Sequence, residues 1–126
     1  MKRVNAMFLL CYPKCTTCQR AQKWLDSQGV QYDYRDIRQE NPTYDELKAW
    51  FPLSGQPIKK LFNTSGLQYK ALNLKEKLLS MSEEDCLKLL ATDGMLVKRP
   101  LVVCDDFVVV GFKEAEWEER LSANKY

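Results

Sequence analysis

The sequence predicts an α/β domain whose mixed four-stranded sheet carries helices on both faces. An apolar run, Met7–Cys11, is followed by an amphipathic helical pattern and a stretch of β-friendly residues, which together form a βαβ unit. Helical patterns then fill the chain over about residues 42–95. Two apolar runs around an acidic turn and one last helix complete the order β-α-β, helical insertion, β-β-α.

The first two strands and the helix between them occupy residues 7–37. The helix is expected to begin near Thr16 and to end at Gly29, a natural C-cap. Residues 30–37 begin with period-two alternation and predict the second strand. Strands joined by one helix form a right-handed crossover, so these two should be parallel. Residues 1–6 are interpreted as a disordered lead.

The middle of the chain is expected to pack on the same core, because no linker-like break marks a second domain. Thr43 and Glu46 have the spacing of a capping box, which predicts a helix that runs to Pro52. Further helical pieces are expected at residues 58–62, at 72–79 with Asn73 as the alternative start, and from Ser82 to Gly94. We therefore predict a single domain over residues 1–126.

The last part of the chain predicts an antiparallel hairpin and a helix. The hairpin covers residues 101–111 and turns at Asp105 and Asp106. The helix covers residues 114–121 and should direct Trp117 toward the core.

The composition is that of a globular chain, with 45% apolar and 29% charged residues among 126. The formal net charge of +2 is too small to predict direct nucleic-acid binding. No apolar run approaches the roughly 20 residues of a membrane span, and the first apolar stretch is too short for a signal peptide. We expect a cytoplasmic protein that does not bind membranes.

Cys15 and Cys18 carry the chemistry that the sequence predicts. They lie where the first strand turns into a helix, so both sulfurs face the same side of the first helical turn. The free N–H groups and the positive end of the helix dipole favour a thiolate at Cys15. Cys15 is thus the expected nucleophile and Cys18 the resolving thiol. The chain has no histidine, so activation must come from the helix end, a cation or hydrogen bonds.

Metal binding by the cysteines is a weaker alternative. Cys11, Cys15 and Cys18 have the spacing of a radical-type iron–sulfur site, but this chain is too short for the large barrel that such chemistry needs. Zinc prefers four ligands, and Cys86 and Cys104 lie far away in the sequence. No metal site is predicted, and Cys11 is expected to be a small buried residue.

Three motifs occur along the chain in a fixed order. They are Tyr-Pro-Lys-Cys-Thr-Thr-Cys at residues 12–18, Lys-Arg-Pro-Leu-Val-Val at 98–103 and Val-Gly-Phe-Lys at 110–113. Together with the helical insertion, they resemble the arsenate reductase family, which includes Spx-type regulators. The resemblance covers nearly the whole chain from Met7 and implies a thioredoxin-like fold.

The resemblance also implies roles for particular residues. Cys15 would be the nucleophile, Pro100 would follow a cis peptide bond, and Arg99 would point at the active cysteine. A cis-proline brings backbone beside the thiol, and an arginine favours a thiolate or holds an oxyanion. Candidate anion-binding residues beside the nucleophile are Lys14, Thr16 and Thr17.

The chain departs from arsenate reductases proper at the positions that bind the oxyanion. Those enzymes have serine and then arginine where this chain has Cys18 and Gln19. Another of their arginines aligns with Asn63, and one more follows the third strand, where residues 104–106 are Cys-Asp-Asp. A tetrahedral oxyanion needs several convergent donors, so these differences favour a dithiol reaction.

We therefore expect a thiol–disulfide oxidoreductase with no bound cofactor. Its substrate would be a small-molecule or protein disulfide, and glutathione, thioredoxin or glutaredoxin would reduce the Cys15–Cys18 disulfide. One alternative is an Spx-type redox-sensing regulator that binds the α subunit of RNA polymerase, for which Gly55 is a weak indication. The other is an arsenate reductase coupled to glutathione or thioredoxin.

Overall fold

The computed structural model describes residues 7–121; residues 1–6, interpreted from the sequence as a lead, lie outside this part. The strands are β1 (Met7–Cys11), β2 (Asp33–Asp36), β3 (Leu101–Cys104) and β4 (Val108–Val110). The α-helices are α1 (Thr16–Ser27), α2 (Tyr44–Ser54), α3 (Leu67–Ala71), α4 (Leu74–Lys77), α5 (Glu83–Leu90) and α6 (Glu114–Leu121). Short 3-10 helices are η1 (Ile58–Leu61), η2 (Leu78–Ser80) and η3 (Gly94–Leu96).

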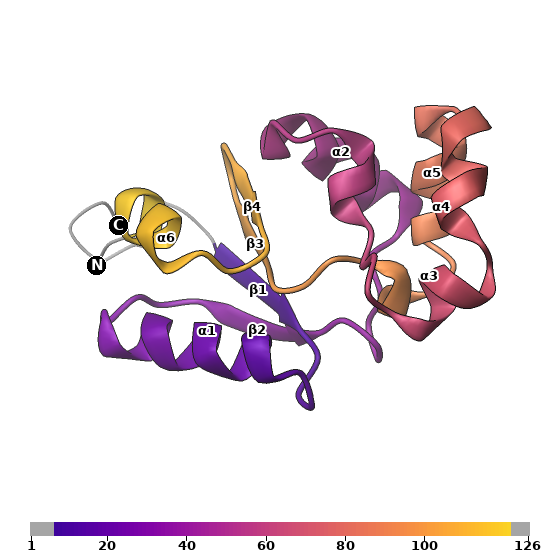
Figure 1. Ribbon diagram of the computed structural model, residues 1–126. Helices are drawn as coiled ribbons and strands as arrows, with labels where there is room; N and C mark the ends of the chain where they lie inside the picture. Colours follow the sequence, from indigo (N-terminus) through magenta and orange to yellow (C-terminus); the bar gives the residue numbers. More distant parts are fainter. Residues whose placement is uncertain (1–6, 122–126) are drawn as a thin grey trace.

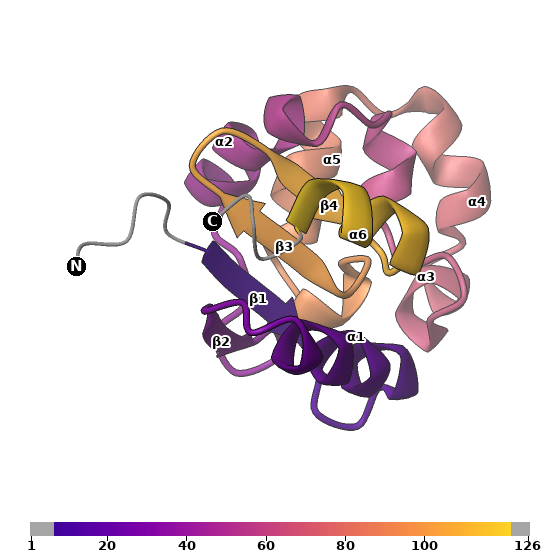
Figure 2. The same ribbon diagram turned by 90° about the vertical axis from the view of Figure 1, so that its left-hand side faces the viewer.

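The strands form one mixed sheet in the order β2-β1-β3-β4. β1 pairs with β2 in parallel, whereas the β1–β3 and β3–β4 pairs are antiparallel. α1 and α6 lie on one side of the sheet and the helices of the insertion on the other (Figure 1). Figure 2 looks onto the side that α1 and α6 cover. The predicted four-stranded, thioredoxin-like arrangement is confirmed.

Apolar cores on both sides of the sheet hold this arrangement, because successive side chains of a strand point to opposite faces. Leu9 and Cys11 of β1 are fully buried against α1 and α6. There the rings of Trp24 and Trp117 meet edge-on, with centroids 6.0 Å apart. Leu10 points the other way, into a core built with the insertion. The start of α1 and the insertion are therefore anchored on opposite faces.

The insertion differs from the prediction in where its helices break. α3 was not expected, and the single helix predicted over residues 72–79 is instead α4 followed by η2. Asn73 separates α3 from α4 because it adopts the left-handed conformation, with φ 54°. α2 continues through Pro52 and ends before Gly55, whose φ of 63° forms a left-handed cap.

Gly94 has a different role from the helix end that the sequence predicts. α5 already stops at Leu90, and Gly94 begins η3 instead. A Cβ at Gly94 would collide with the carbonyl oxygen of Ile37, just beyond β2. This close approach holds η3, and with it the segment that leads to Arg99, against the sheet. β2 is also shorter than the predicted residues 30–37.

Candidate active site

Cys15 lies at the start of α1, beyond the carboxyl end of the central strand β1. Cys15 is the N-cap residue, with φ −86° and ψ 120°, and its side chain caps no backbone N–H. Its own N–H donates to the Tyr12 carbonyl at 2.9 Å, and its carbonyl accepts from the Gln19 N–H at 3.0 Å. The thiol is thus half-buried, held by a fixed backbone and free to react.

Cys18 lies one turn further along α1, beneath Cys15, with only 1% of its surface exposed. The fully buried Cys11, at the end of β1, forms a thiol–thiol hydrogen bond with Cys18. Cys15 also hydrogen-bonds to Cys18, so the three free thiols form a chain from the core to the surface.

This chain of thiols lowers the pKa of Cys18 to about 7, mainly because Cys11 donates a hydrogen bond to it. A backbone hydrogen bond at Tyr12, the Cys15 thiol and the positive charge of Arg99 add to the lowering, and burial opposes it. The same hydrogen bond, together with burial, raises the pKa of Cys11 far above its ordinary value. Cys18 therefore ionises more readily than an ordinary thiol, and Cys11 stays protonated as its hydrogen-bond donor.

Cys11 is buried in the core, as the sequence predicts, but its effect on the pKa of Cys18 was not predicted. The spacing of Cys11, Cys15 and Cys18 was noticed only as a metal pattern. The end of a strand and the first turn of the following helix bring these positions together, and that placement was the usable signal.

Replacing Cys11 with alanine should raise the pKa of Cys18, because the S–H donor is lost. Hydrogen bonds to ionised groups contribute ~1.5–3 kcal/mol and one pKa unit is ~1.36 kcal/mol, so the rise should be about one to two units. Thiolate absorbance across pH, recorded in a Cys15→Ser background, isolates the titration of Cys18. Cys86→Ala, in the other core, is the matched control. An unmoved titration curve in the Cys11 variant would contradict the proposed hydrogen bond.

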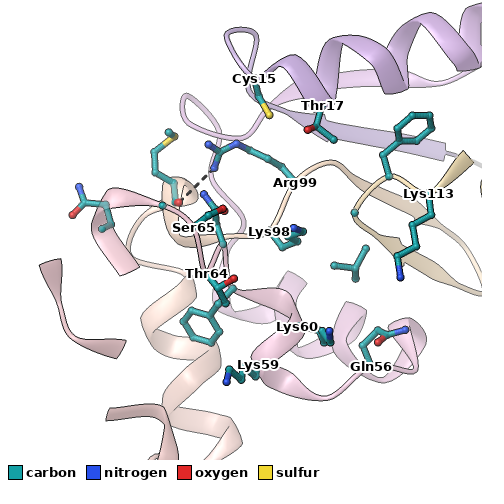
Figure 3. A pocket seen from close by; sticks show the side chains of 18 of the residues that line it. Cys15, Thr17, Gln56, Lys59, Lys60, Thr64, Ser65, Lys98, Arg99 and Lys113 are labelled. Atoms are coloured by element: carbon teal, nitrogen blue, oxygen red, sulfur yellow. Dashed lines mark hydrogen bonds between the residues drawn. The ribbon is translucent and has the colours of Figure 1, made fainter. Parts of the chain in front are cut away.

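Arg99 lies directly before the cis peptide bond to Pro100, which confirms the isomer that the resemblance implies. Its guanidinium carbon lies 5.4 Å from the centroid of the Tyr12 ring, and one terminal nitrogen donates to the Met95 carbonyl at 3.5 Å. Its buried Nε has no hydrogen-bond partner. Figure 3 shows Arg99 beside Cys15, so the cation faces the same space as the thiol.

That space is a cleft of about 1080 Å³ between α1 and the insertion. Cys15 lies at one end and Lys59 and Lys60 at the other, with Arg99 and Lys98 between them (Figure 3). Two backbone bonds of 2.8 Å join the walls: Lys98 N–H to the Leu61 carbonyl and Asn63 N–H to the Leu96 carbonyl. The basic residues before Pro100 and those of η1 are thus held next to each other.

The structure brings together some of the predicted binding residues and leaves others outside. Thr17 and Arg99 line the cleft with Cys15. Lys14 and Thr16 are exposed but do not line it, and Pro100 is buried behind it. Lys14, Thr16 and Pro100 are therefore not among the residues that line the cleft.

The acidic turn at Asp105 and Asp106 is not part of this site. Leu10 pairs with Leu101, whereas Met7 pairs with Cys104, so this turn lies at the end of the sheet away from Cys15. The interpretation of these acidic residues as an altered anion site is wrong. Asn63 does line the cleft, and so do Phe112 and Lys113 after β4.

The charge of the cleft is the feature that linear spacing did not reveal. Its lining contains six of the 19 basic residues of the chain but only one of the 17 acidic residues, Glu116. The six cations are Arg20, Lys59, Lys60, Lys98, Arg99 and Lys113. Nothing in the sequence relates Lys59 and Lys60 to residues 98–113, which lie far along the chain.

Two kinds of feature are not found in residues 7–121. No group of three or more cysteine, aspartate or glutamate side chains is arranged to hold a metal ion. None of the helices there combines the length and the apolar character that a membrane span requires.

The model of the ArsC family matches residues 10–120. The chain belongs to the ArsC family. The ArsC match includes Cys15, Cys18 and the Arg99–Pro100 pair, together with the whole helical insertion. ArsC membership and the thioredoxin-like fold support a thiol oxidoreductase or an Spx-type regulator.

Individual ArsC-like relatives agree with this placement. The chain is 53% identical over 108 residues to the uncharacterized protein YusI of Bacillus subtilis, covering 86% of this chain and 92% of YusI. It is 30% identical over 105 residues to the regulatory protein MgsR of the same organism, covering 83% and 82%. A crystal structure of an ArsC family related protein from Bacteroides fragilis superposes with a TM-score of 0.88 at 57% identity, covering 90% and 97%.

Proposed function

We propose that this protein is a thiol–disulfide oxidoreductase in which Cys15 is the nucleophile and Cys18 the resolving thiol. The proposal rests on two neighbouring thiols: Cys15 lines the cleft, and Cys18 is buried beneath it. The pKa of Cys18 is lowered to about 7. Substrate meets Cys15 in the cleft, whereas Cys18 is positioned to attack only what Cys15 has bound.

The reaction transfers two electrons from the dithiol to the substrate. The Cys15 thiolate attacks one sulfur of a substrate disulfide, so a mixed disulfide forms and the other substrate sulfur leaves as a thiolate. Cys18, ionised near neutral pH, attacks the Cys15 sulfur, forms the Cys15–Cys18 disulfide and releases the second substrate thiol. Glutathione, thioredoxin or glutaredoxin then restores the dithiol by the same exchange.

Arg99 would hold negative charge beside the reacting sulfurs. It lines the cleft with Cys15, and its charge contributes to the lowered pKa of Cys18. Arsenate reduction is less favoured, because the other cleft cations are spread along the walls and do not converge on Cys15 (Figure 3).

A regulator is the second candidate, favoured by the 30% identity to MgsR. In that case the Cys15–Cys18 disulfide would be a switch, and the α subunit of RNA polymerase would be the partner. Gly55, the weak indication of polymerase binding, is explained without such a contact, because its left-handed φ of 63° favours glycine at the end of α2.

Mild oxidation of the reduced protein should form the Cys15–Cys18 disulfide before any other. Lys14 and Arg20 flank the pair, so trypsin releases residues 15–20 as one peptide whose mass falls by that of two hydrogens. Formation of a different disulfide, or none, would contradict the proposal.

Turnover separates the enzyme from the regulator. We expect catalytic reduction of a peptide disulfide when thioredoxin, thioredoxin reductase and NADPH are supplied. A protein that forms the disulfide without turnover, and retains the polymerase α subunit in a pull-down in one redox state, would instead be a regulator.

A further inference from the structure

The cleft in front of Cys15 is far more basic than the rest of the chain. Outside its lining, acidic residues outnumber basic ones, 16 to 13, although the whole chain has a net charge of +2. Within residues 7–121, none of the six cleft cations takes part in an ion pair, whereas Arg35 pairs with Glu46 elsewhere at 2.7 Å. The cleft therefore presents uncompensated positive charge to whatever reaches the thiol.

The positions of these six cations indicate whether the cleft suits a small or an extended ligand. Arg20 belongs to α1, Lys59 and Lys60 to η1, Lys98 precedes Arg99, and Lys113 follows β4. A single small anion needs donors that converge on one point. The cleft has a volume of about 1080 Å³, with Cys15 at one end, and its positive charges are spread along its walls. This arrangement suits an extended ligand with several negative groups.

The remaining lining favours a polypeptide over a nucleic acid. Between the cations lie neutral polar side chains that suit main-chain amides: Gln56, Asn63, Thr64, Ser65 and Gln68. Leu67 lines the cleft with 86% of its surface exposed, as a contact for an apolar side chain. Single-stranded nucleic acids bind on successive aromatic rings, whereas the ring of Phe112 is already stacked under Arg20, 5.8 Å away.

We propose that this cleft binds acidic polypeptide segments, so that the substrates of Cys15 are protein disulfides flanked by aspartate and glutamate. The inference rests on the thiol–disulfide function proposed above. Bound in this way, the acidic flank lies along Lys98, Lys59 and Lys60, and one disulfide sulfur reaches Cys15. The Cys15 sulfur bonds to it, the substrate S–S bond breaks, and Arg99 faces the departing thiolate.

Matched peptides test this specificity. Each has the same internal disulfide and length, and the flanks contain aspartate and glutamate, asparagine and glutamine, or lysine. The reduced protein is mixed with each peptide, quenched with acid, and the reduced peptide is counted by mass spectrometry. We expect the acidic peptide to react at least about tenfold faster than the neutral one at low ionic strength, with the advantage falling as salt is added.

Charge-reversed variants locate the effect. Lys59→Glu combined with Lys60→Glu should remove most of the acidic preference, and Lys113→Glu, on another wall, should reduce it independently. Lys75→Glu with Lys77→Glu is the matched control, because it changes the net charge equally on the exposed face of α4, outside the cleft. The control should leave the ratio of the two rates unchanged.

The outcomes separate this inference from the proposed function. If neutral and acidic peptides react equally fast, or if the control variant lowers the ratio as much as the cleft variants, the acidic cleft specificity is overturned and the oxidoreductase stands. If no peptide is reduced, both fail. If oxidised glutathione shows the same dependence on Lys59 and Lys60, or if an oligonucleotide competes better than a cysteine-free acidic peptide of equal charge, the polypeptide class is wrong.

Discussion

Replacing Cys15 with serine is expected to lower the rate of disulfide reduction by at least about a thousandfold, as loss of a covalent nucleophile does. A serine hydroxyl does not ionise near neutral pH and forms no disulfide. Cys18 does not take over, because 1% exposure keeps its sulfur away from a bound substrate. The measurement is thioredoxin-coupled NADPH consumption with a peptide disulfide.

The matched control for this variant is Cys86→Ser. Cys86 is fully buried on α5, in the core on the other face of the sheet. It should retain the turnover of the unmodified protein once both proteins are shown to be folded by circular dichroism. Substantial activity in the Cys15→Ser variant would show that another thiol is the nucleophile.

Replacing Cys18 with serine should have a different effect, because it leaves the attacking thiol in place. Cys15 still forms the mixed disulfide, but no thiolate remains beneath it to release the product. With glutathione and thioredoxin both omitted, this variant should stop at the mixed disulfide and accumulate as a substrate adduct, whereas the unmodified protein completes one turnover and releases the product. Intact-mass measurement followed by peptide mapping places that adduct on Cys15.

The pH dependence of this second step follows from the lowered pKa of Cys18. In the unmodified protein, release of the product should speed up as pH rises toward about 7, where Cys18 ionises, and then level off. Single-turnover measurements from an isolated mixed disulfide report this step alone. Continued turnover by Cys18→Ser, or an adduct elsewhere than on Cys15, would contradict the resolving role.

Sequence patterns predicted the parts of this structure that depend on local chemistry. Strand β1, the start of α1 at Thr16 and the capping box at Thr43 all follow from periodicity and caps within a few residues. The cis bond before Pro100 followed from the family resemblance. Helix α3 was not predicted, because its five residues are too few to show a helical period, whereas Asn73, the alternative start of the next predicted helix, is the N-cap of α4.

The electrostatics of the site escaped prediction for a different reason. The pKa of Cys18 depends on Cys11, a residue of another element that approaches only when β1 and α1 pack. The basic cleft gathers cations from Arg20 to Lys113, across most of the chain, and only the folded insertion places them together. Sequence patterns assign each side chain to a helix or strand, but only tertiary packing determines which charged side chains line the same cleft.

The buried thiols and the lysines of the cleft are anchored on opposite faces of the sheet. The thiols Cys11 and Cys18 are fixed in the core shared by α1 and α6, whereas Lys59 and Lys60 project from an insertion rooted in the opposite core. Changes in the outer wall of the cleft therefore leave the packing around the sulfurs untouched. The charge of the cleft can therefore vary through Lys59 and Lys60 independently of the residues that hold the two sulfurs.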